Sequence, residues 1–240
     1  MRENCFFIKK DDIVNDQISL TGDEFLHLSK VLRAGVGDKV KCFYDASPFY
    51  DCEIVEITKH YATLKVLGEQ SCLSNPTDRI VLYQALPKLD KLEFIAQKLT
   101  ELGVSEIRPI KTQFCIAKDN PNKLDRLNKI VVSACKQCNR TALLKIAPTT
   151  NLKDADFSEF DLVLFANENE GTVTIDSLHD QIKDAKSIAF IVGSEGGFSN
   201  AEIEKLSKNS HSVSLGKRIL RTETASVAIA SYISLVKEKR

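Results

Sequence analysis

Three glycines stand in a short segment that follows a fully apolar run and precedes a helix start. The segment reads IVGSEGGFS, from Ile191 to Ser199. Gly193, Gly196 and Gly197 allow the backbone to approach a ligand without a Cβ in the way, or to adopt positive φ. The spacing is not the G-x-G-x-x-G of a dinucleotide fold, and no Gly-Lys-Ser/Thr follows as in a P-loop. A ligand loop and a tight strand-to-helix turn both fit this pattern.

A second segment, LGKRILRTETA from Leu215 to Ala225, surrounds two apolar residues with charged ones. A pocket for a flat, partly apolar adenosine flanked by charges would use both kinds of residue. The apolar pair is Ile219 and Leu220. Helix capping would satisfy the threonines at 222 and 224 equally well, so the sequence leaves both interpretations open.

The elements that position these loops alternate between strand and helix from residue 79 onward, which is typical of an α/β domain with a mostly parallel sheet. Apolar runs predict strands at 80–86, 106–110, 161–166, 188–192 and 212–215. Apolar residues at helical spacing predict helices at 89–102, 124–138 and 222–236. A further helix is expected after the capping box formed by Ser199 and Glu202, and Gly103 is expected to end the first helix. Ligands bind at the carboxyl ends of the strands in such a sheet.

The first seventy residues have a different pattern. Short β runs at 5–8, 39–44, 51–58 and 61–67 predict a small barrel-like module. Thr21 and Glu24 match a capping box that would open a short helix through Phe25, Leu28 and Ser29. The segment 68–78 is rich in Gly, Ser, Asn and Pro and is interpreted as a linker. We therefore expect domains at 1–72 and 76–240.

The charges of the 240-residue chain sum to zero but are unevenly distributed. Residues 1–75 carry 9 Lys+Arg against 12 Asp+Glu, and residues 79–140 carry 12 against 6. The middle stretch is therefore expected to make much of the phosphate contact if the substrate is a nucleic acid, although solvated helix faces give the same count. The chain has no long apolar run and no signal-peptide core, so we expect a cytoplasmic protein without a membrane segment.

Cysteine and histidine spacing does not predict a metal site. Seven cysteines, an odd number, are expected to be reduced thiols. The pair Cys135 and Cys138 lacks the further ligands that tetrahedral zinc requires, so core packing is the favoured interpretation. The four histidines have no spacing that indicates a metal centre or a catalytic triad.

The two loop segments together resemble a known family. Gly193 to Ser199 resembles the G-P-E-G-G-[FL]-S loop, and Leu215 to Ala225 resembles the L-G-x-R-I-L-R-x-E-T-A motif, of the RsmE family in the SPOUT superfamily. Further matches are Lys88, the segment 97–103, Gln137 with Arg140, and the segment 27–38. Ser194 stands where the family usually has proline, so this loop is expected to be less rigid.

This resemblance implies a PUA-like N-terminal β-barrel and a C-terminal SPOUT domain with a trefoil knot. It implies a homodimer that uses S-adenosyl-L-methionine to methylate N3 of a uridine in 16S rRNA of the small ribosomal subunit. Three loops after strands would bind the cofactor, through Phe165, Ala166, Asn167, Gly193, Ser194, Glu195, Gly196, Gly197, Leu215, Gly216, Ile219, Leu220 and Thr224. RNA contacts are expected from Arg33, Lys98, Gln137 and Arg140.

Methylation of uracil N3 requires the loss of a proton, which a base or a cationic group would assist. Our hypothesis is that Arg221 stabilises the charge that develops on the uracil carbonyls, while Glu223 orients it or accepts the proton. A structural ion pair between the two is the alternative. Phe198 is expected either to stack on the flipped base or to belong to the core.

Three other functions fit the sequence less well. Another SPOUT enzyme, such as a transfer RNA ribose 2′-O-methyltransferase, would share the knot but not the segments at 27–33 and 98–103. A non-catalytic RNA-binding module would not need the intact glycine loops and the polar cluster at 221–224. A nucleotide-dependent oxidoreductase would need the dinucleotide fingerprint that is missing.

Overall fold

The computed structural model describes residues 4–88, 90–117 and 124–238, and these fold into two compact units. The first unit comprises the residues up to Asn75 together with Cys135–Leu143, and the second comprises Pro76–Ala134 together with the residues from Leu144 onward. The sequence pattern did not indicate that 135–143 returns to the first unit. The domain limits 1–72 and 76–240 stay a prediction.

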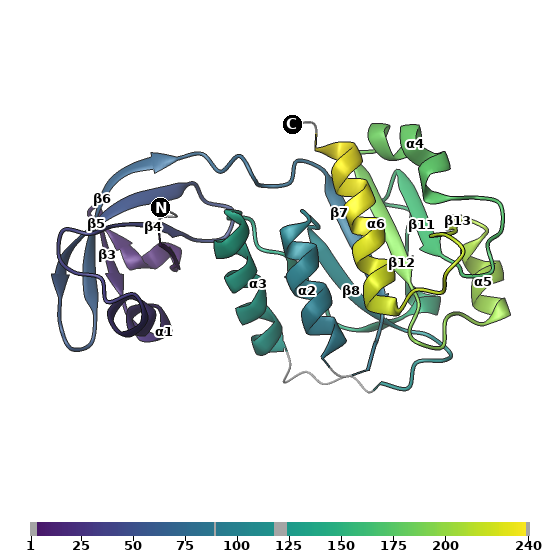
Figure 1. Ribbon diagram of the computed structural model, residues 1–240, viewed down its shortest axis with the longest axis horizontal. Coiled ribbons are helices and arrows are strands. Elements are labelled where there is room, and N and C mark those ends of the chain that lie inside the picture. Colours follow the sequence, from purple (N-terminus) through teal and green to yellow (C-terminus); the bar gives the residue numbers. More distant parts are fainter. Residues whose placement is uncertain (1–3, 89, 118–123, 239–240) are drawn as a thin grey trace. The chain divides into compact units, whose positions relative to one another are not determined.

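The first unit is a curled six-stranded sheet, drawn in purple and blue in Figure 1. Its order is β1-β4-β5-β6-β3-β2, in which β1 and β4 are parallel and all other neighbours are antiparallel. The strands are β1 (Cys5–Phe7), β2 (Ile13–Val14), β3 (Gln17–Leu20), β4 (Lys39–Phe43), β5 (Phe49–Ile57) and β6 (Ala62–Gln70). Alternate residues of β4, β5 and β6 fill one core, as period-2 alternation requires. The β-barrel-like expectation is confirmed, but β2 and β3 were not predicted and β6 extends into the expected linker.

The predicted capping box at Thr21 is wrong. Helix α1 (Gly22–Leu26) does begin after Thr21, but the threonine side chain makes no capping hydrogen bond. Glu24 instead forms an ion pair with Lys136 through its Oε1. The chain continues from α1 as a π-helical turn, His27–Val31.

The second unit is built on a parallel sheet in the order β10-β8-β7-β12-β11-β13, with β9 also paired to β8. All of its neighbouring strands run parallel, so the predicted α/β class is confirmed. The strands are β7 (Arg79–Ala85), β8 (Glu106–Lys111), β9 (Lys145–Ile146), β10 (Thr150–Asn151), β11 (Leu162–Ala166), β12 (Ser187–Val192) and β13 (His211–Val213). The strand order reverses between β7 and β12, the kind of position where open α/β sheets bind ligands.

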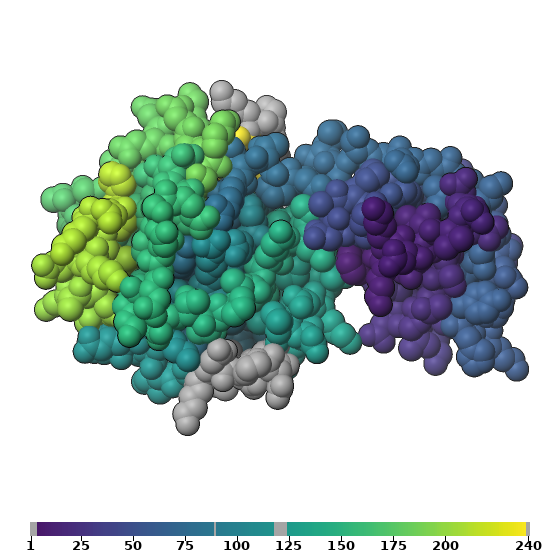
Figure 2. All heavy atoms as spheres, turned by 180° about the vertical axis from the view of Figure 1, so that it is seen from behind, coloured from purple at the N-terminus to yellow at the C-terminus, as the bar shows by residue number. Residues whose placement is uncertain are grey.

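Helices cover both faces of this sheet. They are α2 (Lys91–Glu101), α3 (Leu124–Cys138), α4 (His179–Asp184), α5 (Asn200–Leu206) and α6 (Thr222–Lys237). Figure 1 shows α2 and α6 side by side on one face, and α6 is almost hidden in the opposite view of Figure 2. Leu206 of α5 packs on the other face with Val81, Tyr83 and Phe165. Because strand neighbours alternate between faces, Gln84 points to the α6 side.

Local signals near the two loops had mixed outcomes. The capping box at Ser199 is confirmed, because Ser199 Oγ accepts from the amide of Glu202 and the Ser199 amide donates to the Glu202 carboxylate. Gly103 follows α2 with a φ of +78°, as predicted for the end of that helix. Strand β13 ends at Val213, two residues earlier than expected, so Leu215 lies in the following loop.

Candidate functional site

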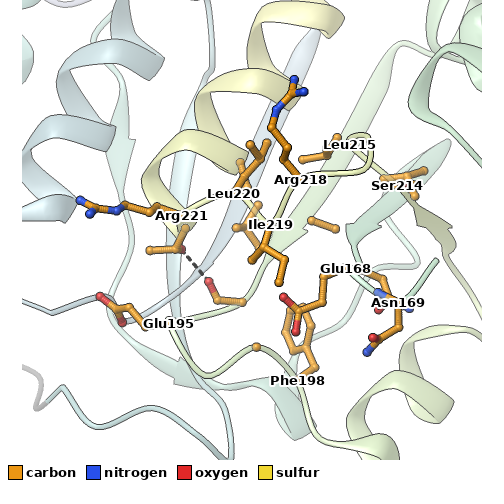
Figure 3. Close-up of a pocket in the computed structure, with 18 of the residues that line it drawn as sticks. Glu168, Asn169, Glu195, Phe198, Ser214, Leu215, Arg218, Ile219, Leu220 and Arg221 are labelled. Atoms are coloured by element: carbon orange, nitrogen blue, oxygen red, sulfur yellow. Dashed lines mark hydrogen bonds between the residues drawn. The ribbon is translucent and has the colours of Figure 1, made fainter. Parts of the chain in front are cut away.

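A pocket of about 380 Å³ opens where β11, β12 and β13 end (Figure 3). Three loops that begin at the carboxyl ends of these strands form its walls, at residues 166–169, 192–198 and 213–222. Lys91, at the start of α2, and Ala225, in α6, also line it. The pocket therefore lies at the sheet edge that the sequence indicated, and its size is that of ordinary small-molecule sites.

Most residues predicted to bind the cofactor lie in the lining. These are Ala166, Asn167, Gly193, Ser194, Glu195, Gly197, Leu215, Gly216, Ile219 and Leu220. Phe165, Gly196 and Thr224 do not line the pocket. Phe165 is fully buried in the core beneath it, and Thr224 is exposed on α6. Their positions outside the lining do not favour direct contact with the cofactor, which stays a prediction for these three residues.

The lining combines apolar and acidic side chains. Ile219 is 81% exposed although it is apolar, and Leu215, Leu220 and Phe198 lie around the same space. Figure 3 shows Glu168 and Asn169 on one side and Arg221 on the other, with its guanidinium directed away from Glu168. Phe198 lines the pocket and packs its ring edge-on against Phe165, with 6.3 Å between the ring centroids. Its stacking on a flipped base stays a prediction.

The glycine loop is a tight turn that requires its glycines for different structural reasons. Gly197 adopts a φ of +66°, and its amide donates to the carbonyl of Ser194 at 3.0 Å. A Cβ on Gly193 would lie 3.1 Å from the Cα of Gly197, a tight contact that would press on the turn. Ser194, which replaces the family proline, donates its hydroxyl to the carbonyl of Phe114 at 3.4 Å. This bond tethers the loop to the segment after β8.

Lys91 is a pocket residue that the sequence did not single out. Its Nζ lies 3.0 Å from Glu195 Oε1 and 3.1 Å from Glu223 Oε2, so one ammonium joins the glycine loop to α6. The hydrogen bond to Glu195, and then that to Glu223, raises the pKa of Lys91. A positive charge in the first turn of a helix is unfavourable, because that end of the helix dipole is also positive. The position of Lys91 therefore indicated that acidic side chains lie nearby.

Glu195 is held charged by the same contacts. Burial acts to raise its pKa, but the hydrogen bonds from Lys91 and from the backbone outweigh it and lower the pKa. One backbone donor is the amide of Lys88, 3.1 Å from Oε1. Lys88, which the resemblance included, thus contributes through its main chain.

The two predicted catalytic residues lie at the start of α6. Arg221 is the N-cap residue, is exposed, and lines the pocket. Glu223 is largely buried, with 16% of its side chain exposed, and pairs with Lys91. The structure thus joins Glu223 to a cation other than the expected Arg221. The catalytic roles of both residues stay predictions.

The residues predicted to contact RNA differ in exposure. Arg33 and Gln137 are exposed, and Arg33 adopts a φ of +52°. Lys98 pairs with Glu101 at 2.9 Å within α2. Arg140 is only 2% exposed, and its side chain donates to the carbonyl of Ala142. Burial lowers the pKa of Arg140. An RNA contact of Arg140 stays untested, and its burial favours a structural role.

Two absences apply to residues 4–88, 90–117 and 124–238. Within these ranges no group of three or more His, Cys, Asp or Glu side chains could hold a metal ion. No helix in the same ranges is long and apolar enough to cross a membrane. The seven cysteines are free thiols.

Comparison with known proteins assigns the family. An RNA methyltransferase domain model matches residues 74–234, and an RNA methyltransferase PUA domain model matches residues 20–67. The ribosomal RNA small subunit methyltransferase E of Buchnera aphidicola (subsp. Schizaphis graminum) is 32% identical over 92% of this chain and 92% of its own length. The chain belongs to the ribosomal RNA small subunit methyltransferase E family. The resemblance inferred from the two loop motifs is confirmed.

Other members of the methyltransferase E family cover almost the whole chain. The enzyme of Rickettsia conorii is 31% identical over 98% of this chain and 97% of its own length. The crystal structure of the Neisseria gonorrhoeae methyltransferase E bound to S-adenosyl methionine has a TM-score of 0.88 at 27% identity, covering 98% of each chain. The family fold, a PUA-like unit with an α/β methyltransferase unit, is therefore that of this chain.

Proposed function

We propose that this protein uses S-adenosyl-L-methionine to methylate N3 of a uridine in 16S rRNA of the small ribosomal subunit. The observation that carries the proposal is the pocket formed by three loops at the ends of β11, β12 and β13. A family member has been crystallised with S-adenosyl methionine. The names of the relatives favour ribosomal RNA over the transfer RNA alternative. The intact pocket favours an enzyme over a non-catalytic RNA-binding module.

The pocket residues fit the cofactor's chemistry. Adenosine has flat, partly apolar faces, which suit Leu215, Ile219 and Leu220. The cofactor also carries an ammonium and a sulfonium, and the carboxylates of Glu168 and Glu195 in the lining complement positive charge. Gly193 and Gly197 expose main-chain groups that can approach a ligand closely. When bound, the cofactor supplies an electrophilic methyl group.

The protein's own contribution is positioning and electrostatics. Methyl transfer requires the nucleophile, methyl carbon and sulfur to be in line, so a pocket that fixes this geometry supplies much of the rate. We infer that Arg221, at the pocket rim, stabilises the negative charge that forms on the uracil carbonyls as the N3 proton leaves. Glu223 orients this group or accepts the proton. Its Oε2 lies 3.1 Å from the ammonium of Lys91.

Several further properties of the family are proposed for this chain. We expect the trefoil knot at the three pocket loops, a homodimer, and action in the cytoplasm on the small subunit or its RNA. Exposed Arg33 and Gln137 suit RNA contact better than Lys98, which is engaged with Glu101.

One experiment tests the function directly. The protein is incubated with tritiated S-adenosylmethionine and small subunits from cells that lack the modification, and the RNA is digested to nucleosides. We expect the label to appear in 3-methyluridine. Label in a 2′-O-methylated nucleoside, or only in transfer RNA when that is offered, would contradict the proposal. Absence of label with a subunit that a known family member does modify would contradict it too.

A further inference from the structure

A buried glutamine interrupts the apolar strand next to the pocket. Strand β7 reads RIVLYQA, and Gln84 in it is fully buried. A buried amide that lacks hydrogen-bond partners destabilises the fold, so a glutamine at this place needs a structural reason. Its neighbours on β7 fill the core with apolar side chains. The reason lies in the side chains that Gln84 meets on α6.

Gln84 is at the centre of a closed hydrogen-bond network. Its Nε2 donates to Thr222 Oγ1 at 2.9 Å and to the carbonyl of Ala85 at 2.9 Å. Its Oε1 accepts from the hydroxyl of Ser226 at 2.6 Å. Both amide hydrogens and the carbonyl oxygen are therefore used. Networks in which every member is satisfied fix one arrangement of the groups that they join.

The network ends on the glycine loop. Thr222 donates its hydroxyl to the carbonyl of Gly193 at 2.6 Å. Gly193 lies in one wall of the pocket. Thr222, which directly follows Arg221, lies at the end of another wall. The hydroxyl of Thr222 thus does not cap α6, so for this threonine the capping interpretation does not hold. One threonine joins two pocket walls, and Gln84 supplies the donor that orients its hydroxyl toward Gly193.

We infer that Gln84 is a positioning residue for the cofactor pocket, acting through Thr222 to fix the glycine loop against the Arg221 loop. This inference rests on the proposed function, because it takes the pocket to be the S-adenosylmethionine site. Gln84 itself does not line the pocket, so it does not touch the cofactor. A merely structural glutamine would stabilise the fold without setting the cofactor affinity, and the two roles are separable by measurement.

The test compares Gln84→Met, Thr222→Val and the double variant by calorimetric titration with S-adenosylmethionine, well below the thermal midpoint of each. We expect each single change to weaken binding roughly tenfold or more, on the scale of one lost buried hydrogen bond. Because Gln84 acts through Thr222, the double variant should be no weaker than Thr222→Val alone. Thr222→Ser keeps the hydroxyl and should bind within about threefold of the parent.

The matched control is Thr100→Val, which removes a fully buried hydroxyl of α2 that bonds to the carbonyl of Ala96 in its own helix. It should leave cofactor affinity unchanged. If Gln84→Met lowers the thermal midpoint but binds the cofactor like the parent, Gln84 is structural and the inference fails. If the losses of cofactor affinity from Gln84→Met and Thr222→Val add in the double variant, the two residues act independently and the inference also fails.

Two outcomes keep the inference separate from the proposed function. If the parent protein itself does not bind S-adenosylmethionine, the proposed function fails first. If Gln84→Met does not fold, Ser226→Ala removes the bond to Gln84 Oε1, together with the bond to the main-chain carbonyl of Thr222, and leaves the Thr222 side chain in place. We then expect a weaker but measurable loss of affinity, and unchanged binding would contradict the inference.

Discussion

Gly196 and Phe114 meet so closely that a Cβ built on the glycine would lie 2.8 Å from the Cβ of the phenylalanine. Real Cβ contacts are essentially never this short. The backbone of Gly196 does not have positive φ, so space and not conformation requires the glycine. The glycine loop thus packs on the segment after β8. Ser194 in the same loop donates its hydroxyl to the carbonyl of Phe114.

We predict that Gly196→Ala weakens S-adenosylmethionine binding roughly tenfold, because the loop must move away from Phe114 to admit the methyl group. Calorimetric titration measures the affinity. The clash is with the Cβ of Phe114, so Phe114→Gly should relieve it. The double variant Gly196→Ala/Phe114→Gly should then bind the cofactor as tightly as Phe114→Gly alone. Phe114→Ala keeps that Cβ and should not restore it.

The control for this prediction is Gly171→Ala, since a Cβ at Gly171 has nothing within 4 Å. It should bind the cofactor like the parent. Undiminished affinity of Gly196→Ala would show that the loop tolerates displacement and is not held by Phe114.

Lys91 is expected to control the charge balance beside the pocket. Lys91→Met leaves Glu195 and Glu223 without their shared cation, so the pKa of Glu195 should rise from its lowered value toward 4.5 and methylation should slow at least about tenfold. Nuclear magnetic resonance of glutamate labelled at Cδ follows the titration. Lys91→Arg keeps the charge and should be intermediate, and Lys208→Met, at an exposed site, should match the parent. An unchanged Glu195 titration would contradict this role.

The lowered pKa of Glu170 predicts that the free energy of unfolding depends on pH in the acid range. Amide donors of Thr172 and Val173, together with the hydroxyl of Thr172, lower its pKa from 4.5 to about 2. Because the folded pKa lies below the unfolded one, the stabilisation is present above pH 4.5 and is lost as the pH falls toward 2. Urea unfolding of Glu170→Gln should therefore differ from the parent most at neutral pH. The difference should shrink between these two values.

The matched control is Glu204→Gln on an exposed face of α5. Its unfolding free energy should follow the parent's pH profile throughout. A constant difference between parent and Glu170→Gln across the acid range would mean that the loop hydrogen bonds do not depend on the charge.

Arg33 and Arg140 are expected to behave differently, although the sequence assigned both to RNA. Arg33 is exposed, so Arg33→Ala should weaken RNA binding and flatten its salt dependence. Arg140 is buried and bonded to a carbonyl, so Arg140→Ala should lower the free energy of unfolding by about 2–4 kcal/mol. Salt-dependent binding and urea unfolding of both variants separate the roles. A flattened salt slope in a stably folded Arg140→Ala would restore the RNA assignment.

The sequence predicted features that depend on local pattern. Strong apolar periodicity located β7, β11, β12 and α6 to within a few residues, and the Ser199 capping box is local chemistry that the structure repeats. The family motifs located most of the pocket. What was missed depends on contacts between distant segments: Phe114 against Gly196, Lys91 between two carboxylates, and Gln84 beneath Thr222. The burial of Arg140 could not be predicted for the same reason, since it depends on the chain that folds over the side chain.

The last prediction concerns the chemical step. Arg221→Ala should lower the methylation rate at saturating cofactor by about a hundredfold or more, the scale for removal of one electrostatic donor to a developing charge. Affinity for S-adenosylmethionine should change little, because Arg221 is exposed at the rim and its guanidinium is directed away from Glu168. Steady-state rates and calorimetry on one preparation separate the two effects. A loss that appears mainly as weaker cofactor binding would place Arg221 in the cofactor site instead.

Glu223→Gln is the companion variant, since it keeps the shape and removes the charge. If Glu223 accepts the proton, the rate of the variant should no longer rise with pH as the parent's does. If the two profiles are parallel, Glu223 only holds Lys91, and the proton leaves to water.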